Sequence, residues 1–108
     1  MEINYSEIIQ KAIYEQAELQ KSSSVSIETI FDTQRHHYLL VHVGWVNGHW
    51  VYGCSLHLDW IDGKIYIQQN NTEQSISERL VELGVPKDQI VIAFHSPFKR
   101  QFTEYAVS

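Results

Sequence analysis

The chain has 108 residues, of which 44% are hydrophobic and 19% are charged, and its formal net charge is −5. This composition predicts one soluble domain over residues 1–108, and the negative charge disfavours autonomous DNA binding, which draws most of its affinity from Lys and Arg at phosphates. No apolar run is long enough to span a membrane, and the acidic start MEINYSEIIQ does not resemble a basic leader, so we expect a cytoplasmic protein.

Two helices are predicted, one at the start of the chain and one in its second half. Over residues 4–21 apolar side chains recur at helical spacing, and Asn4 can cap the first turn. The segment TEQSISERLVELG predicts the second helix, which Thr72 or Ser75 can cap and which Gly84 ends.

A β-meander is predicted between the two helices. Residues 37–70 contain two dipeptides, Asn47-Gly48 and Asp62-Gly63, that are typical of two-residue type I′ hairpin turns, because both central residues of such turns take positive φ. Three strands therefore run through this stretch. The segments VSIETIFD before it and IVIAF near the end of the chain, both rich in β-branched residues, add a fourth and a fifth strand.

The two turns set the register of the meander and so predict which side chains share a face. Leu39 should lie opposite Leu56, and the large apolar residues of both hairpins should form one core face. The facing of the first strand stays open because Ile27 and Ile30 differ in parity, although a β-bulge near Thr29 would reconcile them. The core face comprises Leu39, Val41, Val43, Trp45, Tyr52, Leu56 and Trp60. We therefore predict an α+β fold, a two-layer sandwich in which an antiparallel β-meander of about four to five strands has two helices packed on one face.

The second face of the meander carries an unusual mixture of side chains. Aromatic residues, histidines and two glycines replace the Lys, Glu and Thr of an ordinary solvent-facing side, which favours a surface that something covers. The candidates are the chain's own tail, a second copy in a homodimer, or a partner protein; the alternative is a half-exposed surface without a role. This face comprises Tyr38, Leu40, His42, Gly44, Val46, His49, Val51, Gly53, Ser55, His57, Asp59, Tyr66 and Gln68.

The sequence offers no positive sign of catalysis or of a cofactor. In the predicted register His42 and His57 lie roughly 13 Å apart along the strands, too far to share a metal ion. Cys54 falls opposite Val41 on the core face, where a thiol is usually a small buried hydrophobe. No nucleophile elbow, phosphate loop or paired-carboxylate pattern is found. We expect no catalytic residue, no metal and no other cofactor.

Five segments carry a family resemblance: IFDTQRHHYLLVHVGW, VYGCSLHLD, DGKIYIQQNNTE, LVELGVPKDQIVIAFHSP and KRQFTEYAV. From about residue 30 onward they closely resemble the XisI family, the fdxN element excision controlling factors of cyanobacteria. The resemblance implies a small accessory protein that acts with a partner, XisH, and a site-specific recombinase to control excision of a DNA element. It brings no catalytic residues.

The leading hypothesis is that the second face and the C-terminal tail bind these partner proteins, with DNA contacted only indirectly. The tail could instead pack against its own domain and complete the fold. Aromatic residues are good anchors because they bury much area at small entropic cost. The predicted partner-binding residues are Tyr38, His42, Val51, His57, Tyr66, Phe98, Lys99, Arg100, Phe102 and Tyr105.

Two other classes of function are retained as alternatives. A directly DNA-binding excision factor would use a small basic patch of Arg35, Lys99 and Arg100, and its affinity would fall steeply with salt. A small enzyme or ligand-binding domain with a pocket near His95 and the tail is the least favoured.

Overall fold

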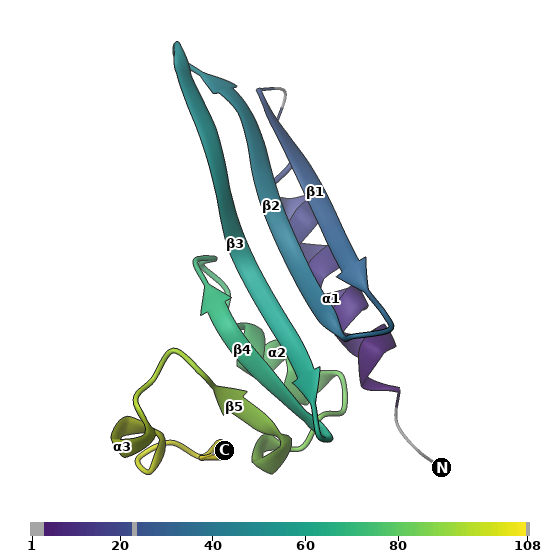
Figure 1. Ribbon diagram of the computed structural model, residues 1–108, viewed down its shortest axis with the longest axis vertical. Helices are drawn as coiled ribbons and strands as arrows, with labels where there is room; N and C mark the ends of the chain where they lie inside the picture. Colours follow the sequence, from purple (N-terminus) through teal and green to yellow (C-terminus); the bar gives the residue numbers. More distant parts are fainter. Residues whose placement is uncertain (1–3, 23, 108) are drawn as a thin grey trace.

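The computed structural model describes residues 4–22 and 24–107 and consists of one five-stranded sheet with helices behind it (Figure 1). The strands lie in the order β1-β2-β3-β4-β5, and all neighbours are antiparallel except β4 and β5. The elements are α1 (Tyr5–Leu19), β1 (Val25–Asp32), β2 (His37–Val46), β3 (His49–Ile61), β4 (Lys64–Asn70), α2 (Ile76–Glu82), the 3₁₀ turn η1 (Lys87–Gln89), β5 (Ile90–Ile92) and α3 (Pro97–Arg100). The predicted α+β fold is confirmed.

Helices α1 and α2 lie behind the sheet in the view of Figure 1, so one face of the sheet is covered and the other is open. The connection through α2 returns the chain to the end of the sheet at which β4 began, which is why β5 pairs parallel to β4. No helix in the described part of the chain has the length and apolar character needed to cross a membrane.

The local signals of the sequence are found where they were predicted. Asn47 and Asp62 both have φ of 50°, and each is followed by a glycine with positive φ, as type I′ turns require. The Asn4 side chain caps α1. Of the two candidates for α2, Ser75 is the cap and accepts from a backbone N–H of the first turn.

The predicted register fails in the middle of the first hairpin. Near the turn the pairs are as predicted, for example Trp45 opposite Trp50, but Leu56 lies opposite Leu40 rather than Leu39. The register shifts between Leu40 and Val41, so that Ser55 is an extra residue on β3. A bulge of one residue moves every later side chain of one strand to the other face relative to its partner.

The bulge reverses the faces that the sequence predicted for β2. Tyr38 and Leu40, predicted for the second face, are fully buried beneath α1, whereas Leu39 and Trp45, predicted for the core, lie on the face without helices. The faces predicted for residues 56–61 of β3 and for the paired residues 64–67 of β4 are confirmed. The sheet contributes Tyr38, Leu40, Leu56, Leu58, Ile65 and Ile67 to the core, and the helices contribute Ile9, Ala12, Ile13, Ile76 and Leu80.

The first strand needs no bulge. Its pairing with β2 runs from Val25 to Asp32 without a shift, so the facing that the sequence left open is settled without a bulge near Thr29. Ile27 and Phe31 pack against the core, whereas Ile30 is 49% exposed on the open face. The mixed parity of β1 therefore reflects a strand with apolar residues on both faces.

The tail returns to its own domain through its backbone. The Ala106 N–H donates to the Ile90 carbonyl at 2.9 Å, and Ala106 bridges to β5. The Arg100 guanidinium donates to the carbonyls of Ala93, His95 and Val107, each at 3.0 Å. A guanidinium bonded to three carbonyls holds the tail in place.

Candidate functional site: the open face of the sheet

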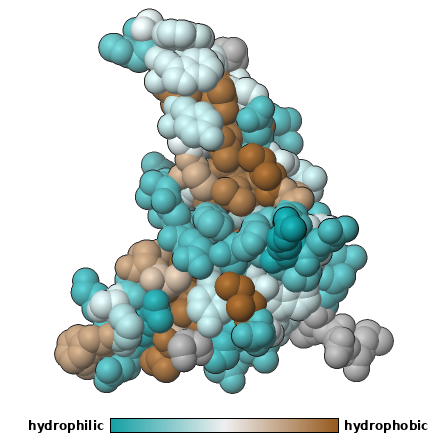
Figure 2. Space-filling model, viewed as in Figure 1, coloured by the Kyte–Doolittle hydropathy of each residue, from teal (hydrophilic) through white to brown (hydrophobic). Residues whose placement is uncertain are grey.

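The open face of the sheet carries a continuous apolar patch. Figure 2 shows it as a hydrophobic band over the middle of β2 and β3 with aromatic side chains toward the end of the first hairpin. The apolar patch comprises Ile30, Leu39, Val41, Val43, Trp45, Trp50, Tyr52 and Cys54. Val41 is buried by its neighbours, with 6% exposed, whereas Ile30, Trp45, Trp50 and Tyr52 are 49% to 73% exposed. Monomeric domains seldom leave several large apolar side chains exposed on one surface unless the surface binds something.

The aromatic residues at the end of the hairpin are the most exposed part of the patch. Trp45, Trp50 and Tyr52 are 64%, 55% and 73% exposed. The two indole rings meet edge to face with centroids 5.4 Å apart. The turn at Asn47 and the antiparallel pairing hold the rings in this arrangement, so that a ligand would meet a largely pre-ordered surface.

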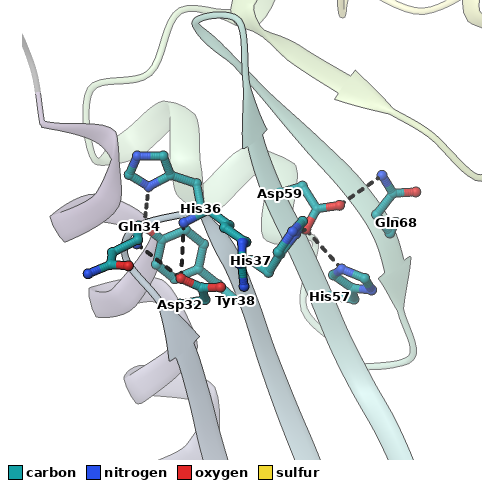
Figure 3. Close-up of polar contacts among 9 residues, drawn as sticks. Asp32, Gln34, His36, His37, Tyr38, His57, Asp59 and Gln68 are labelled. Atoms are coloured by element: carbon teal, nitrogen blue, oxygen red, sulfur yellow. Dashed lines mark hydrogen bonds and ion pairs between the residues drawn. The ribbon is translucent and has the colours of Figure 1, made fainter.

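A polar cluster, which we call the His37 cluster, lies on the same face at the other end of β2 and β3 (Figure 3). It consists of His37, His57, Asp59 and Gln68. His37 Nδ1 and His57 Nε2 donate to Asp59 Oδ1 at 2.8 and 2.9 Å, and Gln68 Nε2 donates to Asp59 Oδ2 at 3.3 Å. Asp59 is 7% exposed, so its carboxylate depends on these three donors. The cluster was missed in the sequence because the predicted register placed His37 opposite Leu58 rather than opposite Asp59.

The ten predicted partner-binding residues do not form one surface. Tyr38 is fully buried, with its hydroxyl 2.5 Å from Ser6 Oγ and 2.8 Å from His36 Nδ1 (Figure 3 shows the second contact). His42 and Val51 lie on the helix side of the sheet. Among the predicted residues of the meander, the open face retains only His57 and Tyr66.

The predicted tail residues are also divided. Phe98 and Phe102 are 67% and 75% exposed, and their rings meet edge to face at 5.3 Å. Lys99 is exposed beside them. Tyr105 packs against the core, and Arg100 is occupied by backbone carbonyls. Of the five predicted tail residues, Phe98, Lys99 and Phe102 thus remain exposed.

The basic residues are not gathered in one patch. Arg35 lies in the turn between β1 and β2, and Lys99 lies in α3; these segments are at opposite sides of the molecule in Figure 1. Since Arg100 is also engaged, no shared phosphate-binding surface is formed by these three residues.

Cys54 pairs with Val41 as predicted but lies on the open face and is half-buried. Its thiol donates to the Leu56 carbonyl, with Sγ and O 2.9 Å apart. Burial raises the pKa of the Cys54 thiol. The thiol is therefore protonated at neutral pH, which argues against a nucleophile.

One serine–histidine contact borders a cavity of about 750 Å³ on the helix side. His42 Nε2 lies 2.9 Å from Ser55 Oγ, the residue that forms the bulge. Within residues 4–22 and 24–107 no carboxylate hydrogen-bonds to the His42 ring, so the orienting third group of a catalytic triad is missing there. The hollow of about 290 Å³ beside Phe94 is smaller and is not lined by His95.

Comparisons with known proteins agree over nearly the whole chain. Residues 2–107 match the family model described as XisI protein. The chain is similar to the crystal structure of a XisI-like protein from Anabaena variabilis, with 39% identity over 96% of each chain and a TM-score of 0.89. It is also similar to the fdxN element excision controlling factor XisI from the same organism, with 33% identity over 96% of each chain and a TM-score of 0.85. No curated protein is matched by the chain.

Proposed function

The chain belongs to the XisI family, and on that premise we propose that it is a non-catalytic accessory factor that controls excision of a DNA element. It acts in the cytoplasm through contacts with an XisH-like protein and a site-specific recombinase, and it reaches DNA through them. The description of one similar structure as an fdxN element excision controlling factor supports the role in excision. The route through protein contacts is supported by the surface of the molecule.

The observation that carries the proposal is the uncovered apolar patch. Its central residues Leu39, Val41 and Val43 belong to a strand whose other face is the core, so they cannot turn inward. The exposed indoles at its end have the character of interface anchors, since Trp and Tyr dominate the energetics of protein interfaces. A nucleic acid would require cations at this surface, and the apolar patch contains none.

We assign the apolar patch to the XisH-like protein rather than to DNA or to the tail. The tail is already tied to β5 by Ala106 and by the three carbonyl contacts of Arg100, at the opposite edge of the sheet from β1. Polar side chains of the His37 cluster border the patch at one end, which matches the pattern of an apolar centre with a polar rim.

Binding of purified XisH-like protein to single-residue variants tests this proposal. Trp50→Ala and Tyr52→Ala should each weaken binding by at least tenfold, because a buried aromatic anchor is worth about 2 kcal/mol or more. Their melting temperatures should stay close to that of the wild type, since both side chains are more than half exposed. Phe98→Ala and Phe102→Ala are the matched controls, being equally exposed aromatic residues outside the patch.

Two results would contradict the proposal. If the two tail variants lose binding while the hairpin variants keep it, the contact is on the tail and not on the open face. Retardation of element-end DNA by the chain alone, at low salt and sensitive to Arg35→Ala, would show that DNA is contacted directly.

A further inference from the structure

Three groups that commonly ligate metals converge on the open face. His37 Nδ1, His57 Nε2 and a carboxylate oxygen of Asp59 all lie within 4.8 Å of one another. They come from the first residue of β2 and from two alternate residues of β3, so that one pair of neighbouring strands presents all three on the same side. Two imidazoles and one carboxylate form a donor set used by zinc enzymes and by non-haem iron sites.

The backbone holds this group together. His37 and Asp59 are direct cross-strand partners, and His57 is two residues from Asp59 along β3, which puts its side chain on the same face. Gln68 on the next strand donates to the second carboxylate oxygen at 3.3 Å. Such an outer contact orients a ligating carboxylate and leaves its other oxygen free for an ion.

Access is also suitable for an ion that enters from solvent. The Asp59 side chain is 9% exposed, whereas those of His37 and His57 are 46% and 33% exposed. The carboxylate therefore forms the floor of the site and the two imidazoles form its rim. Ligand positions on the solvent side would remain for water or for a group of another molecule.

We propose that His37, His57 and Asp59 form a binding site for a divalent transition-metal ion, of which Zn²⁺ is the representative. Ligand atoms bound to one tetrahedral ion at 2.0–2.2 Å are about 3.4 Å apart. The two His–Asp59 contacts of 2.8 and 2.9 Å must therefore open by about half an ångström, and any separation near the 4.8 Å limit must close by about 1.4 Å, which rotation of the partly exposed imidazoles can supply. Each neutral imidazole carries its proton on the other ring nitrogen when it ligates. The ion then replaces the two hydrogen bonds to Asp59 Oδ1. The site is independent of the proposed excision role.

Metal binding by the tag-free full chain, stripped with chelator, tests the proposal without any activity assay. We expect one Zn²⁺ per chain by titration against a chromophoric chelator. At a hundredfold excess over Kd, a stabilisation of about 2.7 kcal/mol should raise the melting temperature by about 10 °C or more. Cobalt(II) should give the visible absorption of a site with nitrogen ligands. His37→Ala and His57→Ala should each weaken Zn²⁺ binding by at least tenfold.

His49→Ala is the matched control, because His49 is an exposed histidine on the same strand and lies outside the cluster. It should keep the stoichiometry, the affinity and the thermal shift of the wild type. Failure of the wild type to bind Zn²⁺ stoichiometrically would overturn the proposal. Wild-type affinity for Zn²⁺ in His37→Ala and His57→Ala would also overturn it. So would a loss of affinity in His49→Ala as large as that in the two cluster variants, since the ion would then be held elsewhere. Far-UV circular dichroism of the variants shows whether loss of binding is merely loss of fold.

Discussion

Adjacent leucines on β2 allow the position of the bulge to be tested directly. Leu40 is fully buried against the helices, whereas Leu39, one residue earlier, is half-buried on the open face. Leu40→Ala should destabilise the domain by about 3 kcal/mol, the middle of the range for a buried leucine, because it removes apolar contacts and leaves a cavity. Leu39→Ala should cost about 1 kcal/mol, since only part of the side chain is buried and solvent can fill the space.

Urea denaturation followed by far-UV circular dichroism measures the free energy of unfolding of both variants, and thermal denaturation followed by the same signal measures their melting temperatures. At roughly 4–8 °C per kcal/mol for a domain near this size, the melting temperature should fall by more than 10 °C for Leu40→Ala and by several degrees for Leu39→Ala. The two substitutions delete the same atoms from the same strand, so each is the other's control. Equal losses, or a larger loss for Leu39→Ala, would refute the register shift and restore the face assignment predicted from the turns alone.

Three further predictions concern the covered side of the sheet. Gly44→Ala should destabilise the domain by about 1–3 kcal/mol, because the added Cβ would lie 2.5 Å from the backbone oxygen of Ser24. Gly53→Ala is the control, because its Cβ would meet no atom within 4 Å and the variant should be nearly neutral. Equal melting temperatures for the two variants would contradict this. Tyr38→Phe should lose about 0.5–1.5 kcal/mol in urea denaturation, because it removes the contacts of a buried hydroxyl with Ser6, which keeps its hydrogen bond from Gln10, and with the partly buried His36. An unchanged midpoint would contradict this. The hydrogen bonds from Arg79 lower the pKa of the Glu15 carboxyl, so their contribution to stability is complete above pH about 4.3 and is lost as the pH falls through the lower folded-state pKa. Arg79→Met should therefore flatten the fall of melting temperature across that acid window, and an unchanged pH profile would count against the pair.

Local features of the fold could be predicted because they depend on residues close in the chain. The type I′ turns follow from the positive φ that Asn47 and Asp62 adopt with their glycines, and the caps follow from short polar side chains at Asn4 and Ser75. The strand VSIETIFD was found from its β-branched residues. Helix and strand identities were therefore accessible before any tertiary contact was known.

The candidate site was predicted only in fragments. His57 and Tyr66 lie on the open face as expected, but Tyr38 is in the core, and the apolar patch consists largely of side chains assigned to the core. The strict alternation of apolar residues on β3, through Tyr52, Cys54, Leu56 and Leu58, hides the extra residue at position 55. The same alternation is expected whether the apolar side chains of residues 52–58 all point to one face of the sheet or change from the open face to the core face at a bulge.

The sequence by itself determined the order and type of the elements, the two hairpin turns and the family to which the chain belongs. Only the tertiary structure decided which side of β2 the helices cover, because that choice is a competition between whole faces of the sheet. Docking of α1 buries Tyr38 with its hydroxyl beside Ser6 and leaves Leu39 outside. The bulge at Ser55 lets β3 keep its own leucines in the core at the same time. The apolar patch and the pairing of His37 with Asp59 both depend on that bulge.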